Sequence, residues 1–281
     1  KLSCYRNNGR GGFERLEKAP FDTVAIRDQT ALLGRHSRST PSSQPSALLL
    51  VGLSNYEDGS TNGSSVLQLK PNGSVIANSF PDRSANVGPL ALADMDGDGD
   101  LDLFAGGRAI PGRYPEAAPS QLYRLNGTGF QIDATNSAAF KNIGVVNGAV
   151  WRDLDGDGFP ELLLACEWGP LRIFRNGQGR LVSWNAPVRI NSQLSTLNDL
   201  SGWWNGVATG DFDGDGRLDI VAANWGLNGD NTASRERPLQ LYYGDLMERG
   251  VMDLIEVEWD SRAKAFAPRR RLDVLGRHIP V

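Results

Sequence analysis

Apolar residues occur along this chain in short runs that are separated by glycine-rich loops. Runs of three to six residues are too short for helices, and their flanking turns favour β-strands. Two later runs, Gln121–Leu125 and Leu171–Arg175, end in Asn-Gly, which supplies the positive φ angles of tight hairpins. The pattern therefore predicts antiparallel strand pairs. The paired runs are Gly88–Ala93 with Leu103–Ala105, Gly148–Trp151 with Leu162–Ala165, and Gly206–Thr209 with Ile220–Ala223.

Each of these pairs flanks the same acidic motif of nine residues. The motif occupies Asp94–Asp102, Asp153–Glu161 and Asp211–Asp219, and its starts are 59 and 58 residues apart. A regular period of this length is typical of stacked supersecondary units, and three or four antiparallel strands per unit make a propeller blade. The 281 residues hold between four and five such units.

We therefore predict an all-β fold, a single β-propeller domain over residues 1–281. The predicted blade periods run near 35–93, 94–152, 153–210 and 211–281. The run Ala47–Gly52 is the second strand of an earlier blade without an acidic loop, and a Ser/Pro-rich segment precedes it. Because the chain opens within the third strand of a blade, the ring in this chain can be incomplete.

The spacing of the acidic residues predicts calcium sites. Carboxylates at positions 1, 3 and 5 converge when the loop curls around an ion, glycine at position 6 permits the turn, and the carbonyl of position 7 adds a ligand. The closing carboxylate lies at position 9 instead of position 12, so these are β-hairpin loops and not EF-hands. About three Ca²⁺ ions are expected. The predicted ligands are Asp94, Asp96, Asp98, Asp100 and Asp102; Asp153, Asp155, Asp157, Phe159 and Glu161; and Asp211, Asp213, Asp215, Arg217 and Asp219, with Asp100, Phe159 and Arg217 contributing carbonyls.

Plain solvated turns are the alternative interpretation of these loops, but they do not explain the same spacing three times. A fourth segment, Asp245–Asp253, keeps the two end acids and has Met247 and Arg249 at positions 3 and 5. We hypothesise that the charge of Arg249 replaces an ion there.

Charge distribution supports bound cations. The net charge of −4 argues weakly against nucleic acid as a partner, but 13 of the 33 acidic residues lie in the three loops. Such concentration costs self-repulsion unless a cation fills the site. No apolar stretch is long enough to span a membrane. Cys4 and Cys166 can form a disulfide or remain two buried thiols.

The acidic loops resemble those of FG-GAP/VCBS repeats, whose best-known members are the β-propellers of integrin α-subunits. Gly106–Pro115, Cys166–Pro170 and Ala223–Asn228 are more similar to bacterial ASPIC/UnbV-type secreted repeat proteins. The resemblance implies a calcium-binding propeller outside the cytoplasm, whether secreted, at the cell surface, in the periplasm or associated with an outer membrane. It does not imply one activity, since such propellers serve adhesion, glycan binding and, in some pectin lyases, catalysis.

Candidate ligand-binding residues lie on the face opposite the acidic loops. Strand entrances and exits there carry aromatic and basic side chains that suit a sugar or a peptide. The alternative is that the tryptophans pack between blades, as we expect for Trp151. The candidates are Arg108, Arg113, Tyr114, Trp168, Trp203, Trp204 and Trp225.

Motifs for catalysis are missing from the sequence. The two histidines, His36 and His278, have no Ser or Cys partner in a recognisable motif, and no catalytic residue is nominated. The sequence therefore favours a calcium-stabilised extracellular module that binds a protein or a polysaccharide, without nucleic acid or a membrane span. The alternatives are a lyase-like enzyme acting on polysaccharide and an architectural domain of a larger secreted protein. Further domains, or a second chain that completes the propeller, are possible partners.

Overall fold

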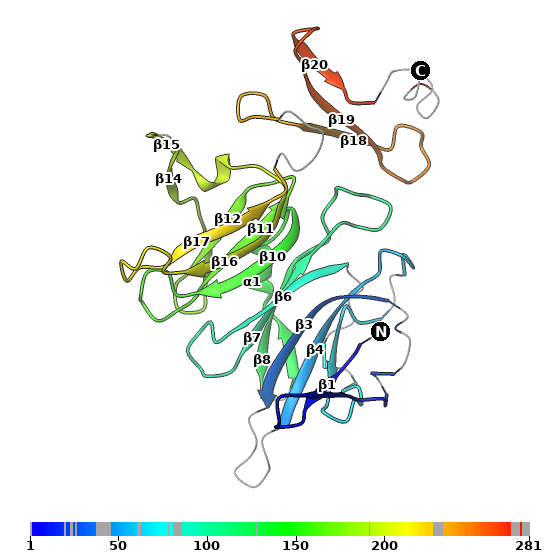
Figure 1. Cartoon of the computed structure of the whole chain (residues 1–281), viewed down its shortest axis with the longest axis vertical. Helices are drawn as coiled ribbons and strands as arrows, with labels where there is room; N and C mark the ends of the chain where they lie inside the picture. The colour runs from blue at the N-terminus through cyan, green and yellow to red at the C-terminus, as the bar shows by residue number, and fades with distance from the viewer. Residues whose placement is uncertain are drawn as a thin grey trace.

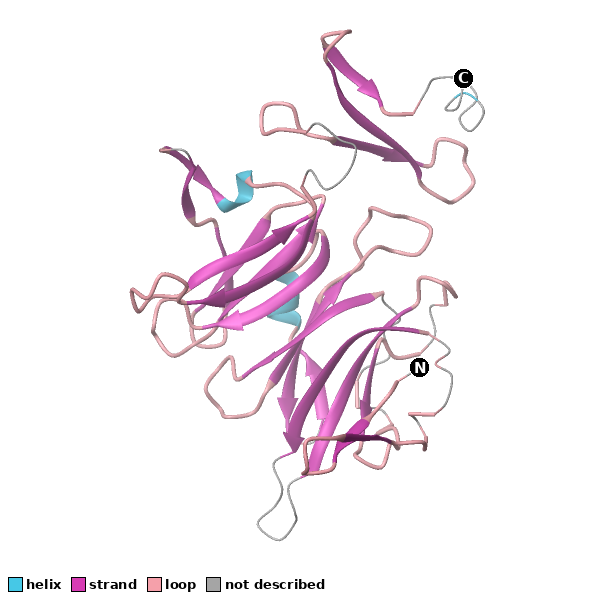
Figure 2. Cartoon of the chain, in the orientation of Figure 1, coloured by secondary structure: helices cyan, strands magenta, loops and turns pink. Residues whose placement is uncertain are grey.

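The computed structural model describes residues 2–19, 21–22, 25, 27–37, 46–60, 63–77, 79–80, 86–127, 129–190, 192–226, 233–270 and 276. The fold is all-β and built from antiparallel sheets. One short helix, α1 (Ala134–Ala139), and one 3-10 turn (Leu197–Asp199) interrupt the described strands (Figure 2). No helix of the described residues is long and apolar enough to cross a membrane.

The sheets follow one another along the chain as propeller-type blades. The first three blades are β3 (Asp28–Ser37), β4 (Ser46–Ser54) and β5 (Val66–Leu69); β6 (Val87–Ala93), β7 (Asp102–Gly107), β8 (Gln121–Asn126) and β9 (Gly129–Ile132); and β10 (Val145–Arg152), β11 (Glu161–Glu167), β12 (Leu171–Asn176) and β13 (Leu181–Trp184). Two shorter sheets follow, β16 (Trp204–Gly210) with β17 (Asp219–Asn224), and β18 (Gln240–Gly244), β19 (Asp253–Asp260) and β20 (Ala265–Pro268). Separate hairpins are formed by β1 (Tyr5–Asn7) with β2 (Phe13–Arg15) and by β14 (Pro187–Ile190) with β15 (Gln193–Thr196).

The strand pairs predicted around the three acidic loops are confirmed. They are β6 with β7, β10 with β11, and β16 with β17, each antiparallel. The predicted runs Gln121–Leu125 and Leu171–Arg175 form β8 and β12, which pair with the second strands of their blades. The Ser/Pro-rich segment falls mainly on residues 38–45, which lie outside the described residues.

The first strands of successive blades, β3, β6, β10 and β16, lie side by side in a row (Figure 1). Glycines permit the close approach of these strands. A Cβ atom added at Gly148 would lie 2.9 Å from Cα of Gly206, and one at Gly88 would lie 2.7 Å from the carbonyl oxygen of Val146. The row of strands therefore explains the glycine at the start of two predicted first strands, Gly88 and Gly148, whereas a Cβ atom at Gly206 would meet no atom within 4 Å.

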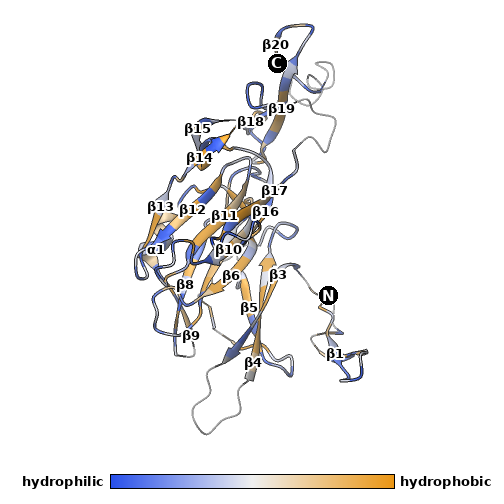
Figure 3. Ribbon diagram, turned by 60° about the vertical axis from the view of Figure 1, so that its left-hand side comes forward, coloured by the Kyte–Doolittle hydropathy of each residue, from blue (hydrophilic) through white to orange (hydrophobic). Residues whose placement is uncertain are grey.

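Apolar residues fill the space between neighbouring sheets, and the loops are more polar (Figure 3). One cluster includes Phe104, Phe140, Phe174 and Trp151, so the expectation that Trp151 is a core residue is confirmed. Cys4 and Cys166 are both free thiols, and burial raises the pKa of Cys166 to about 11.

The last sheet, β18 to β20, lies apart from the row of blades in Figure 1. Its contact with the earlier blades includes a hydrogen bond from the amide of Met252 to the carbonyl of Gly112 at 2.9 Å. On β18, Tyr242 is 58% exposed and Tyr243 is 50% exposed.

Candidate functional site

The three acidic loops share one pattern of hydrogen bonds. In each, the aspartate at position 1 accepts hydrogen bonds from the amides of the glycines at positions 4 and 6. In the second loop, Asp153 accepts from Gly156 at 2.8 Å and from Gly158 at 3.0 Å. Asp94 and Asp211 make the matching pairs in the other loops. Positive φ angles of these glycines make this curl possible.

The curl brings carboxylate oxygens together. In each of three groups, one oxygen per residue lies within 4.8 Å of the others. Two oxygens on one Ca²⁺ ion, each at about 2.3–2.6 Å, can be separated by roughly this distance, so each group fits around one ion. The groups are Asp94, Asp96 and Asp98; Asp153, Asp155 and Glu161; and Asp211, Asp213 and Asp219.

The predicted ligands at positions 5 and 7 contact each other in every loop, and of these only Asp98 also belongs to one of the three groups. The carboxylate at position 5 accepts a hydrogen bond from the amide at position 7 in each loop, at 2.8 Å. This contact lowers the pKa of Asp215 in the third loop. The pairs are Asp98 with Asp100, Asp157 with Phe159, and Asp215 with Arg217.

Glu161 is the buried member of the second group. Its two carboxylate oxygens accept hydrogen bonds from the amides of Leu154, at 2.8 Å, and Asn176, at 3.3 Å. Burial raises its pKa above the usual value for glutamate, which disfavours the charged form. A cation beside this carboxylate would offset that cost.

Asp102, the closing residue of the first loop, is placed differently. It is buried beside Arg124, whose Nη1 lies 2.9 Å from its Oδ2 and 2.7 Å from Oδ2 of Asp96. Burial raises the pKa of Asp102 to about 6, although the amide of Leu125 and Arg124 favour the ionised form. The first loop therefore gathers Asp94, Asp96 and Asp98 without its predicted closing ligand.

The fourth loop has the same curl, and its residue Arg249 forms an ion pair with the closing acid Asp253. Asp245 accepts hydrogen bonds from the amides of Arg249 at 2.8 Å and Gly250 at 2.7 Å, as Asp211 does from Asp215 and Gly216. The guanidinium of Arg249 donates to Oδ1 of Asp253 at 2.6 Å. This arrangement agrees with the hypothesis that Arg249 supplies the positive charge.

Three of the predicted tryptophans meet at the opposite end of the strands. The ring centroids of Trp168 and Trp203 are 5.2 Å apart, and those of Trp203 and Trp225 are 5.0 Å apart. The amide of Trp225 also donates to the carbonyl of Trp203 at 2.9 Å. We call these three residues the aromatic row.

Glu167, at the end of β11, connects the aromatic row to other candidates. Its carboxylate accepts hydrogen bonds from the hydroxyl of Tyr114 and, at 3.1 Å, from Nδ2 of Asn147. Arg108 lies 3.8 Å away, and Nε1 of Trp168 donates to the hydroxyl of Tyr114. Burial, with the adjacent Glu167, raises the pKa of Tyr114, so the phenol stays protonated.

Two candidates do not join this cluster. Nε1 of Trp204 donates to the carbonyl of Leu200 at 2.9 Å, which is a packing role. Arg113 forms an ion pair with Glu116 in its own loop at 2.7 Å.

Sequence reasoning missed Glu167, Asn147 and Arg124. Glu167 lies within Cys166–Pro170, a stretch noted above for its resemblance, and an acid after a buried apolar run was an available signal. Its partner Tyr114 is 53 residues away, and a single sequence does not show that contact.

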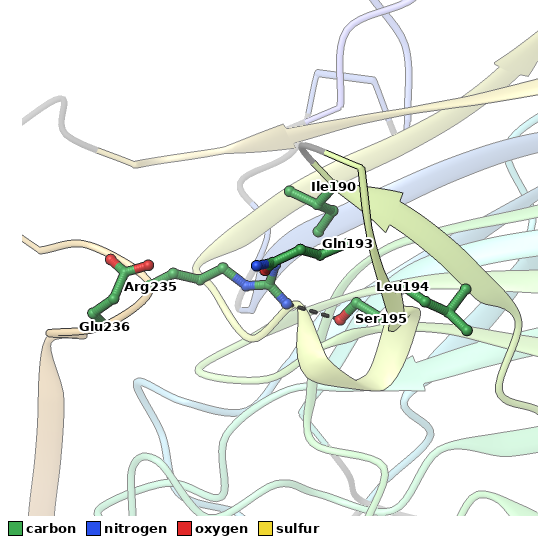
Figure 4. A pocket seen from close by; sticks show the side chains of 6 residues that line it. All are labelled: Ile190, Gln193, Leu194, Ser195, Arg235 and Glu236. Carbon is green, nitrogen blue, oxygen red and sulfur yellow. Dashed lines mark hydrogen bonds between the residues drawn. The ribbon is translucent and has the colours of Figure 1, made fainter.

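A shallow cleft of about 350 Å³ lies elsewhere, against the β14–β15 hairpin (Figure 4). Nη2 of Arg235 reaches across it to Oγ of Ser195 at 2.8 Å. Leu194 is 72% exposed at its edge, and none of the predicted site residues lines it.

Comparisons with known proteins bear on the repeat. No curated protein sequence matches this chain. Among solved structures, the exotype rhamnogalacturonan lyase YesX is 15% identical with a TM-score of 0.37, and rhamnogalacturonan lyase YesW is 16% identical with a TM-score of 0.38. Each match covers 85% of this chain, which spans about half the length of those enzymes, 48% and 49%.

Residues 153–222 match the family model described as FG-GAP-like repeat. This segment contains the second and third acidic loops, all of β11 to β16 and the first part of β17, whereas β10 precedes it. The resemblance to FG-GAP repeats stated from the sequence is therefore confirmed for residues 153–222.

Proposed function

We propose that this chain is a calcium-stabilised β-propeller module that works outside the cytoplasm and binds a protein or a glycan. Three acidic loops that share one hydrogen-bonded curl, each gathering three carboxylates within reach of one ion, carry this proposal. The FG-GAP-like repeat at residues 153–222 supports it.

Calcium would have a structural role in these loops. Each loop joins the first and second strands of a blade, so a bound ion would hold the hairpin and neutralise carboxylates that otherwise repel one another. All-oxygen sites rich in carboxylates select hard cations, and Ca²⁺ tolerates flexible geometry better than Mg²⁺. Extracellular calcium modules have Kd values of about 10⁻⁴–10⁻³ M, so such ions bind where calcium is plentiful.

Isothermal calorimetry with Ca²⁺ tests this proposal on the protein after EDTA treatment and dialysis. We expect about three ions per chain. Asp153→Asn and Asp211→Asn should each lose one ion, because asparagine lacks the charge that binds calcium and keeps only one of the two oxygens that accept the glycine amides.

Asp260→Asn is the matched control. Asp260 also accepts backbone amides, from Arg262 and Ala263, but belongs to none of the three acidic groups. This variant should keep all ions. Unchanged calorimetric counts in the two loop variants would contradict the assignment of the loops.

A further inference from the structure

The aromatic row is partly exposed, with Trp168 and Trp203 half-buried, and it is separate from the buried hydrophobic clusters. The buried clusters of the described residues include Trp151 but none of Trp168, Trp203 and Trp225. Trp225 is 49% exposed. These observations favour a surface for contact with another molecule over simple packing between blades.

Backbone contacts hold the aromatic row in place. The loop after β11 and the loop before β16 pair through Gly169 and Gly202, whose amides and carbonyls exchange hydrogen bonds of 2.9 and 3.2 Å. Trp168 has a φ angle of +52°, a left-handed conformation that costs a non-glycine residue free energy. Such strain persists where the surrounding contacts fix it, and it is concentrated at binding sites.

A cleft of about 600 Å³ opens between the first strands of neighbouring blades, and none of the three tryptophans of the aromatic row lines it. Its polar lining includes Asp28, Thr30, Arg108 and Asn147, from β3, the loop after β7, and β10. Arg108 and Asn147 are also the partners of Glu167. Glu167 accepts a hydrogen bond from Tyr114, and Tyr114 accepts one from Trp168, so a chain of contacts connects Arg108 and Asn147 at the cleft with the aromatic row.

Two oxygens at the cleft lack hydrogen-bond partners. Oγ1 of Thr30 and Oδ1 of Asn147 are buried without one, while Nδ2 of Asn147 is held by Glu167 and by the carbonyl of Trp204. Buried polar atoms without partners are costly and uncommon. After a side-chain rotation, hydroxyl groups of a ligand could donate hydrogen bonds to both oxygens.

The charges at this site favour a neutral ligand. Arg108 lines the cleft together with Asp28, and its guanidinium lies 3.8 Å from the buried carboxylate of Glu167. An anionic ligand would meet uncompensated negative charge, whereas hydroxyl groups can both donate to the carboxylates and accept from Arg108. Pyranose rings combine such hydroxyls with a C–H face that packs on an aromatic ring. The size of the cleft is within the range of ligand pockets, about 300–1,000 Å³.

We propose that this site binds a neutral glycan. One sugar unit packs on the aromatic row, and a neighbouring unit enters the cleft, where Arg108, Asn147 and Thr30 contact its hydroxyl groups. This inference rests on the proposed binding function and names its ligand class.

Affinity electrophoresis and calorimetry against neutral and acidic polysaccharides, in calcium buffer, test the proposal. We expect neutral glycans to retard the protein, with an affinity that changes less than twofold between low and high salt. Trp225→Ala should weaken binding at least tenfold. Tyr243→Ala is the matched control, since Tyr243 is 50% exposed on β18, and it should change the affinity less than twofold.

Asn147→Asp tests the cleft separately from the aromatic row. It replaces the Nδ2 donor to Glu167 with a carboxylate, and it should weaken glycan binding at least tenfold. The melting temperature of each variant is measured in parallel to detect loss of folding. Arg108→Gln, at a side chain 44% exposed, removes the cation with little effect on folding and should also weaken binding several-fold.

Three outcomes would overturn the inference. They are stronger binding of acidic than neutral polysaccharides, equal binding by wild type and Trp225→Ala, and no binding to the glycan panel. If no glycan binds but EDTA still lowers the melting temperature, the chain would remain a calcium-stabilised module, and its partner would be a protein. A melting temperature insensitive to EDTA would instead contradict the proposed function.

Discussion

The guanidinium group of Arg124 contacts two blades at once. It binds Asp102 and Asp133 in its own blade, at 2.9 and 3.0 Å, and donates to the carbonyl of Gly179 in the next blade at 2.7 Å. Asp102 is almost fully buried, so its charge depends on this partner. Removing one member of a buried pair leaves an uncompensated charge, which costs about 3–5 kcal/mol.

We therefore expect Arg124→Met to lower the free energy of unfolding by about 3 kcal/mol, measured by urea denaturation in EDTA. Arg175→Met is the control. Arg175 is half exposed and lies 3.5 Å from Asp155, and exposed ion pairs contribute about 0–1 kcal/mol. Equal losses in both variants would show that Arg124 has no special structural role.

At this scale the sequence identifies residues whose role depends on local spacing. The first, third and ninth positions of the second and third acidic loops lie together, because the glycines between them determine the curl, whereas the predicted ligands at position 5, Asp157 and Asp215, lie outside these groups. Asp102 could not be placed from spacing, since its partner Arg124 lies 22 residues further along the chain, on the neighbouring strand β8. Glu167 was missed for the same reason, because its contacts with Tyr114 and Asn147 come from other elements.

Among the structural elements, the hairpins around the acidic loops follow directly from the sequence. The apolar runs on both sides of each glycine-rich turn are too short for helices and predict paired strands. The observed pairs β6–β7, β10–β11 and β16–β17 agree with this prediction. The β18–β19 hairpin belongs to the same type. Its loop keeps Asp245 and Gly250 in the roles of Asp211 and Gly216 but holds the side chain of Arg249 against Asp253.

The fourth loop should become a calcium site when its missing acids are restored. The double substitution Met247→Asp and Arg249→Asp removes the internal cation and completes the spacing of positions 1, 3, 5 and 9. Calorimetry should count one more Ca²⁺ ion per chain than in the wild type. Met247→Ala with Arg249→Ala, which removes the arginine without adding carboxylates, should leave the count unchanged. A gain of no ion by the acidic variant would mean that the curl alone does not define the site.

Across the whole molecule, the acidic loops lie at one end of the strands and the aromatic row lies at the other. The register of β10 with β11 makes this clear, since Arg152 pairs with Glu161 beside the loop and Val145 pairs with Glu167 at the far end. β10 and β16 run in a similar direction in Figure 1, so their loops share one side. Calcium binding and glycan binding are therefore assigned to opposite faces, and calcium would act on the ligand site through the stability of the blades.

EDTA should consequently lower the melting temperature by roughly 8 °C. At a calcium concentration tenfold above Kd, each site adds about 1.4 kcal/mol, and three independent sites add about 4 kcal/mol. In a domain of this size, 1 kcal/mol shifts the melting temperature by about 2 °C. Differential scanning calorimetry with and without EDTA measures the shift.

Asp153→Asn should lose roughly a third of that shift, because one of three sites no longer contributes. Adding Mg²⁺ in place of Ca²⁺ should restore little of it, since Mg²⁺ demands near-octahedral geometry at about 2.0–2.1 Å and retains its water. Full recovery of the melting temperature by Mg²⁺ would indicate that the loops respond to divalent charge in general. An equal EDTA shift in wild type and Asp153→Asn would place the stabilising ion outside the second loop. Either result would mean that the curled geometry of the loops does not by itself identify Ca²⁺ as the bound ion or the second loop as its site.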